Sequence, residues 1–280
     1  MPDHFGIGQR ALKGLRNEPQ MAAATSLIDM PIGHAADDSL RAAQHLRDAG
    51  AGCIIVLGGD GTCRIVSKAC GQVPLLPVST GTNNVVPHFI EGTVAGSAAA
   101  FVALQPESER YRLCRRHKRL VVHLNGRQAD QALVEVTVLS ARFVGARAIW
   151  ETGSLRQLFV SRAQPFSIGL STIIGVVQPV EPTHPGGAAV TIVPNGRKVR
   201  APIAPGSFVE VGIGPIVDLV PGIRHPVAAE RPAILAFDGE RELSLYEGDE
   251  AEVALELDGP WIVDVRRTLE TAVAAGAFLE

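Results

Sequence analysis

One carboxylate among glycines is the part of the chain best suited to chemistry: Gly58-Gly59-Asp60-Gly61-Thr62 directly follows an apolar run at residues 53–57. The run is rich in β-branched residues and predicts a buried parallel strand. Glycines after such a strand expose backbone amides, and the amides and dipole of the next helix favour an anion such as phosphate. The alternative interpretation is an ordinary glycine-rich turn between a strand and a helix.

The carboxylate of Asp60 is negatively charged and would repel a phosphate group. This carboxylate is therefore predicted to hold a divalent cation or to accept a proton from an attacking hydroxyl. A carboxylate in this turn weakens anion binding unless a cation intervenes. Asp60 thus favours an enzyme over a protein that only binds phosphate.

A second polar loop, Ser79-Thr80-Gly81-Thr82-Asn83-Asn84, follows the next predicted strand at residues 73–78. Neighbouring parallel strands end at the same edge of a sheet, which is where open α/β sheets bind ligands. Ser, Thr and Asn also cap helices. We therefore expect some residues of this loop to cap and others to bind.

Strand and helix patterns alternate in the first part of the chain and predict a parallel α/β sheet with right-handed crossovers. The expected strands lie at residues 22–30, 53–57 and 74–78, and the expected helices at residues 37–49, 62–70 and 93–104. Beyond residue 118, hairpin dipeptides at Asn125-Gly126, Asn195-Gly196 and Asp238-Gly239 predict antiparallel sheet. A last strand is expected at 261–265, then a helix at 267–278 with Leu269, Val273 and Ala277 on one apolar face.

The composition describes a globular protein: 280 residues, 46% apolar, with a net charge of −3. Nothing in it calls for a nucleic-acid partner, and the basic stretch at residues 110–119 is interpreted as a linker that could also attract an anionic substrate. The four cysteines form no CxxC pair, which favours reduced thiols. No apolar run is as long as a membrane span and no secretory pattern is present, so we expect a cytoplasmic protein without a membrane partner.

GGDGT, then GTNN, then a late Asp238-Gly239-Glu240 resemble the superfamily that unites NAD kinases with diacylglycerol and sphingosine kinases. Within it, the chain most resembles the acetoin-catabolism protein X family, an NAD-kinase-like branch. The resemblance implies an α/β nucleotide-binding domain over residues 1–117 and a β-sandwich substrate domain over 118–265. It also implies a closing helix over 266–280 that packs back on the first domain.

The same resemblance implies a cleft that binds ATP, with NAD as a further substrate or ligand. Asp60 and Glu240 are the expected catalytic residues, and Asp60 is the expected Mg²⁺ ligand, because phosphoryl transfer depends on positioning and charge neutralisation. The expected nucleotide-binding residues are Gly58, Gly59, Gly61, Thr62, Thr80, Gly81, Thr82, Asn83 and Asn84.

The chain departs from its relatives at three places. Asn84 stands where lipid kinases usually carry an acidic residue, and Val134 precedes Glu135 where NAD kinases carry an Asn-Glu pair. We interpret Glu135 as an outward charge on a half-buried strand, and residues 169–173 echo the NAD-binding loop only faintly. The first strand and Asn-Pro loop of relatives have no counterpart, so we expect a missing βα unit, an open sheet edge, and a homodimer or homotetramer.

Three functions remain open on the sequence. The first is a phosphotransferase that moves phosphate from ATP to a hydroxyl of a small molecule or dinucleotide. The second is a non-catalytic accessory or sensor protein that binds NAD or ATP, in a pathway such as acetoin catabolism. The third is a lipid kinase whose acceptor groove would be lined by Ile173, Ile174, Val176 and Val177, although these residues equally suit a sandwich core.

Overall fold

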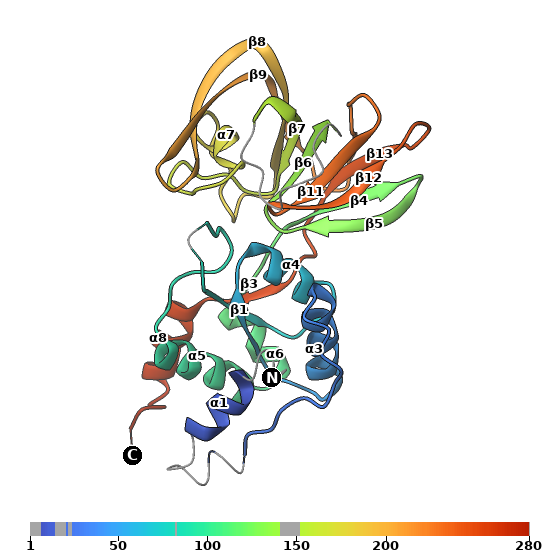
Figure 1. Ribbon diagram of the computed structural model, residues 1–280. Coiled ribbons are helices and arrows are strands. Elements are labelled where there is room, and N and C mark those ends of the chain that lie inside the picture. The colour runs from blue at the N-terminus through green and yellow to red at the C-terminus, as the bar shows by residue number, and fades with distance from the viewer. Residues whose placement is uncertain (1–6, 15–20, 22–23, 82, 141–151, 280) are drawn as a thin grey trace.

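The computed structural model describes residues 7–14, 21, 24–81, 83–140 and 152–279. In these residues the chain forms one mostly parallel sheet and two antiparallel sheets. Figure 1 shows the parallel sheet and most of the helices in the lower half and the antiparallel sheets in the upper half. The predicted fold class, a parallel α/β part followed by an antiparallel β part, is confirmed. None of the helices in this part of the chain is long and apolar enough to cross a membrane.

The lower sheet has the strand order β1-β2-β14-β3. Strands β1 (Ile54–Gly58) and β2 (Leu75–Ser79) are parallel, and β14 (Trp261–Val263) is parallel to β2. Strand β3 (Cys114–Arg116) closes the sheet antiparallel to β14. The last strand of the chain therefore belongs to the same sheet as the first, although the sequence pattern groups residues 261–265 with the β-rich part.

Helices cover both faces of the lower sheet. Apolar residues of α3 (Ala36–Asp48) and α4 (Asp60–Ser67) pack on one face. Those of α5 (Gly92–Leu104) and α8 (Val265–Ala274) pack on the other. The described part of this half also contains three short helices: α1 (Ile7–Gly14), α6 (Glu107–Arg110) and the 3₁₀ helix η3 (Tyr111–Leu113).

The lower half also departs from its sequence pattern in two strands. Residues 24–30 form no strand, while residues 22 and 23 lie outside the described part. Strand β1 was expected to be buried on both faces, yet Ile55 and Leu57 are 44% and 63% exposed. The reason is that β1 lies at the sheet edge, with β2 as its only partner among the described strands.

The buried face of α8 also differs from the prediction. Leu269 packs against the core as expected, but Val273 is 66% exposed and Ala277 lies beyond the end of the helix. The fully buried positions are Thr268 and Ala272, which are four residues apart and therefore share one face. The buried face of α8 is therefore displaced by one residue along the sequence from the face that the sequence pattern predicted.

The upper half contains two antiparallel sheets with an apolar core between them. The first sheet consists, in spatial order, of β10 (Arg224–Pro226), β13 (Ala251–Glu256), β4 (Arg119–Leu124) and β5 (Arg127–Ala132). The second consists of β12 (Glu240–Leu245), β11 (Ala233–Phe237), β6 (Glu135–Ser140), β7 (Leu155–Val160), β8 (Gly187–Ala204) and β9 (Ser207–Leu219). A second core lies between this sheet and α7 (Thr172–Gly175), and the 3₁₀ helix η4 (Thr152–Ser154) precedes β7.

Two of the three predicted hairpin turns are present. Asn125-Gly126 and Asp238-Gly239 both adopt positive φ at their two residues, as a tight two-residue turn requires. The prediction at Asn195-Gly196 is wrong, because β8 continues through it and Ile192 and Arg197 both pair with Ile213. Residues 193–196 are therefore a bulge, and the β8–β9 turn lies at residues 205–206 instead.

The chain passes between the two halves twice, at residues 117–118 and at residues 257–260. These two crossings lie against each other. The His117 amide donates to the Pro260 carbonyl at 2.9 Å. Gly259 approaches so closely that a Cβ there would lie 2.5 Å from the His117 carbonyl oxygen. The two crossings therefore form one joint.

Candidate functional site

The three sequence motifs meet where the two halves of the molecule face each other. Gly58 at the end of β1 is in register with Ser79 at the end of β2, so the first two loops share one sheet edge. The third motif reaches this edge from the upper half. A Cβ added to Gly61 would lie 2.9 Å from Glu240 Oε1, at the start of β12.

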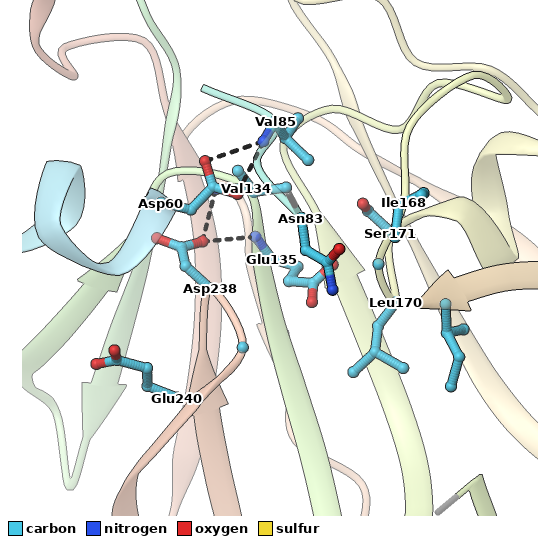
Figure 2. A pocket seen from close by; sticks show the side chains of 13 residues that line it. Asp60, Asn83, Val85, Val134, Glu135, Ile168, Leu170, Ser171, Asp238 and Glu240 are labelled. Atoms are coloured by element: carbon cyan, nitrogen blue, oxygen red, sulfur yellow. Dashed lines mark hydrogen bonds between the residues drawn. The ribbon is translucent and has the colours of Figure 1, made fainter. Parts of the chain in front are cut away.

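A cavity of about 210 Å³ lies at this junction. Figure 2 shows Asp60 and Asp238 on one side of it, Ile168, Leu170 and Ser171 on the other, and Glu135 between them. Of the residues that the sequence proposed, Asp60, Asn83 and Glu240 line this cavity. The other lining residues are Val85, Val134, Glu135, Ile168, Gly169, Leu170, Ser171, Ile203, Asp238 and Gly239.

Asp60 is the first residue of α4 and is 8% exposed. Its carboxylate accepts hydrogen bonds from the amide of Val85, at 2.9 and 3.1 Å, and from that of Val86, at 2.7 Å. Burial, followed by the nearby charge of Asp238, raises the pKa of Asp60 to about 7, although the two amides act in the opposite direction. Near neutral pH this carboxyl group can therefore both take up and release a proton.

The first turn of α4 keeps unused amides beside Asp60. Within the described residues, the amides of Gly61 and Thr62 donate no hydrogen bond. Gly58 permits the tight turn before them, because a Cβ there would lie 2.6 Å from the Thr62 side chain. Free amides at the start of a helix are a favourable place for an anion.

The loop after β2 divides into supporting and exposed parts. Asn84 Nδ2 donates to Ser79 Oγ at 2.7 Å, and Ser79 Oγ donates to the Gly81 carbonyl at 2.9 Å. Asn84 also packs on the first loop, since a Cβ on Gly59 would lie 2.7 Å from its Oδ1. These residues shape the loop, and Asn83 is the loop member that lines the cavity. Thr80 is exposed, and Thr82 lies outside the described residues.

Asp238 fixes the third motif to the start of β6. Its carboxylate accepts hydrogen bonds from the amides of Leu133, Val134 and Glu135 at 2.8–3.0 Å. Burial raises the pKa of Asp238 despite these bonds. Glu240, two residues later, keeps 53% of its side chain exposed and lies 4.0 Å from Arg64. The turn therefore positions one supporting and one accessible carboxyl group.

The interpretation of Glu135 as an outward charge is wrong. Its side chain lines the cavity and only 5% of the residue is exposed. Burial, followed by the charge of Asp238, raises the pKa of Glu135 to about 8. The Glu135 Oε2 atom is buried without a hydrogen-bond partner. The strand pattern around Glu135 could not show this, because the cover comes from residues 168–171, which are distant in the sequence.

Two buried arginines accompany these carboxyl groups, and no motif in the sequence marks either of them. Arg64 of α4 is fully buried and bonds both carboxylate oxygens of Asp130 at 3.2 and 3.3 Å. Arg162 is 3% exposed, and its Nη2 lies 2.8 Å from His117 Nδ1. The charge of Arg162 lowers the pKa of Asp60, while burial lowers the pKa of Arg162 itself to about 10. Arg162 therefore partly offsets the negative charge of the cavity.

A metal ion at Asp60 stays a prediction. In the described part of the chain, no group of three or more His, Cys, Asp or Glu side chains is arranged to hold a metal. Magnesium sites in phosphoryl-transfer enzymes often use one or two protein carboxylates, with phosphate oxygens and water as the other ligands. Asp60 and Glu240 both lie at the cavity and fit such a role.

Comparison with known protein families agrees with the architecture. The model of the ATP-NAD kinase N-terminal domain matches residues 9–105, and that of the acetoin catabolism protein X C-terminal domain matches residues 118–258. The fold and these matches define an NAD kinase-like protein. The acetoin catabolism protein X of Cupriavidus necator is 39% identical over 265 residues, which cover 91% of this chain and 73% of that protein. The chain belongs to the acetoin catabolism protein X family.

Two solved structures are also similar. Yeast NADH kinase in complex with NADH has 17% identity and a TM-score of 0.47, and the match covers 81% of this chain and 66% of the yeast chain. An NAD kinase from Archaeoglobus fulgidus in complex with ATP has 16% identity and a TM-score of 0.48, with coverage of 97% and 95%.

Proposed function

We propose that the protein is a phosphotransferase that moves the terminal phosphoryl group of ATP to a hydroxyl of a small molecule or dinucleotide. The observation that carries this proposal is the position of Asp60. It is a buried carboxyl group with a pKa of about 7, it lines the cavity, and it adjoins the unused amides of Gly61 and Thr62. The name of the Cupriavidus necator relative supports a link to acetoin catabolism.

In this proposal the acceptor hydroxyl gives its proton to Asp60 while its oxygen attacks the γ-phosphorus. The bond between that phosphorus and the bridging oxygen breaks, and ADP leaves with the bond electrons. A carboxylate offers about four lone-pair positions, so the three amide bonds to Asp60 leave room for one more contact. The amides of Gly61 and Thr62 would bind phosphate oxygens, and Mg²⁺ held by Glu240 would neutralise the developing charge, because the remaining contact of Asp60 is taken by the acceptor hydroxyl.

A nucleotide-binding accessory or sensor protein is the second candidate. It is favoured by the three amide bonds that already hold the Asp60 carboxylate. A lipid kinase has less support, because Ile173 and Ile174 are fully buried in the upper core and line no acceptor groove.

The test combines calorimetric titration with ATP, with and without Mg²⁺, and measurement of ADP release with NAD and with small hydroxylated acceptors. The variants are Asp60→Asn and Glu240→Gln, with Glu247→Gln in an exposed turn as the control. Asp60→Asn is expected to bind ATP within a few-fold of the wild type and to lose turnover by about 10²-fold or more. Turnover that survives in Asp60→Asn would refute the role of Asp60 as the base. ATP binding without any product would favour the sensor.

A further inference from the structure

Two buried polar atoms in the cavity, Glu135 Oε2 and Ser171 Oγ, lack a hydrogen bond of good geometry to the protein. They belong to residues that are 5% and 1% exposed. Both residues line the same cavity, and they face each other closely enough for the amide and the hydroxyl of Ser171 to lower the pKa of Glu135, although these contacts leave Oε2 and Oγ without a hydrogen bond of good geometry. Buried polar groups in native proteins are almost always paired. Two orphaned atoms in one cavity therefore indicate a ligand that carries polar groups of its own.

The rest of the wall on this side is apolar. Val134, Leu170 and Ile203 are buried aliphatic residues, and Ile168 and Val85 are partly buried. A volume of about 210 Å³ is below the range of roughly 300–1,000 Å³ that is usual for larger organic ligands. The occupant must therefore be short, and part of its surface must be hydrocarbon.

The charge of the cavity restricts the ligand further. Its lining contains the four carboxyl groups of Asp60, Glu135, Asp238 and Glu240. An anionic group such as a pyrophosphate would oppose the ionisation of these carboxyl groups and would meet buried acceptor atoms on this side. A neutral ligand with hydroxyl groups meets neither obstacle, because a hydroxyl can donate to or accept from the carboxyl group of Glu135 and can also accept from Ser171.

We propose that this cavity binds a short-chain aliphatic diol, with one oxygen on Glu135, the other on Ser171, and the carbon chain against Val134, Leu170 and Ile203. This inference rests on the proposed function in one respect: Asp60 lines the same cavity, so the bound diol is the candidate phosphate acceptor. A dinucleotide would then not be the acceptor.

The test is a ligand-observed NMR titration of the full chain, without nucleotide, with 1,2-propanediol, 1,2-butanediol, 1,2-pentanediol and 1,2-hexanediol. Burial of each added methylene should raise the affinity by about fourfold until the cavity is full. Glu135→Leu and Ser171→Ala should each weaken binding by about fivefold or more, because each removes one hydrogen-bonding group. Two independent variants keep the test decisive if one of them fails to fold. Glu247→Gln should bind as the wild type does.

An affinity that does not depend on chain length would overturn the proposal. So would unchanged binding in both cavity variants, or adenosine that binds more tightly than every diol and displaces it. The result separates this proposal from the proposed function. Diol binding without any phosphoryl transfer would support the ligand assignment and count against the kinase. Phosphorylation of NAD by a protein that binds no diol would overturn the ligand assignment and leave the kinase intact.

Discussion

Glu135→Gln is expected to stabilise the protein, and to do so more strongly as the pH rises. Burial and the charge of Asp238 raise the pKa of Glu135 from 4.5 to about 8. Between these two pH values the folded chain holds a proton that the unfolded chain has released. The free energy of unfolding of the wild type must therefore fall as the pH rises through this window. Glutamine has nearly the same shape and no charge, so it removes this penalty.

The size of the effect follows from about 1.36 kcal/mol for each unit of pKa shift. For the shift from 4.5 to about 8, the variant should exceed the wild type by about 1 kcal/mol at pH 5, about 3 kcal/mol at pH 7 and about 4 kcal/mol at pH 8. Above pH 9 the difference should level off near 5 kcal/mol. These are upper values, because the neighbouring carboxyl groups titrate in the same range.

Urea denaturation of both proteins at pH 5, 6, 7, 8 and 9, followed by circular dichroism, measures this difference directly. Glu247→Gln, an exposed carboxyl removed in the same way, provides the matched control and should show no comparable trend. A stability difference that does not change with pH would refute the reasoning. A destabilised variant at pH 8 would refute it as well, since that result would require an ionised and well-solvated Glu135.

Three further predictions concern the frame around the cavity. Gly61→Ala should change stability by less than about 1 kcal/mol, because the half-exposed Glu240 can swing away from the new Cβ, yet it should alter nucleotide affinity in the calorimetric titration. A large loss of Tm would contradict this. Arg64→Ala should lower the free energy of unfolding by about 2 kcal/mol in urea, because it removes the hydrogen bonds of a fully buried arginine to Asp130, while Lys68 keeps Asp130 paired; a loss below 1 kcal/mol would show that the contact is unimportant. Asp264→Ala removes the side-chain cap of α8 and should cost about 1 kcal/mol by thermal unfolding, and an unchanged Tm would argue against the cap.

Local chemistry was sufficient to predict much of this fold. The helices α3 and α5 have strong local signals, and each begins and ends within one residue of the prediction. The positive φ angles of Asn125-Gly126 and Asp238-Gly239 follow from residue types that tolerate the left-handed region. Asn195-Gly196 has the same residue types, but its neighbours pair across a bulge with β9. Whether this dipeptide forms a hairpin turn or a β-bulge depends on the partner strand, so the dipeptide alone could not predict the outcome.

In the candidate site, too, some residues are marked by the local sequence and others are defined only by the tertiary structure. Asp60 stands out in the sequence because glycines surround it, and Glu240 because its Asp-Gly-Glu motif resembles that of related kinases. Glu135 and Arg162 carry no such signal: each is buried by segments far away in the chain, and each has an ordinary strand or loop sequence around it. Long-range burial, which sets the charge balance of the cavity, is the property that a single sequence encodes least directly.

The paired crossings at residues 117–118 and 257–260 have a mechanical consequence. Two domains joined by a single segment can rotate about that segment. Two connecting segments that are hydrogen-bonded to each other restrict the relative motion mainly to hinge opening and closing. The domains would then come back to the same alignment after every opening. Carboxyl groups from one domain would meet the amides of the other in the same geometry each time a ligand enters.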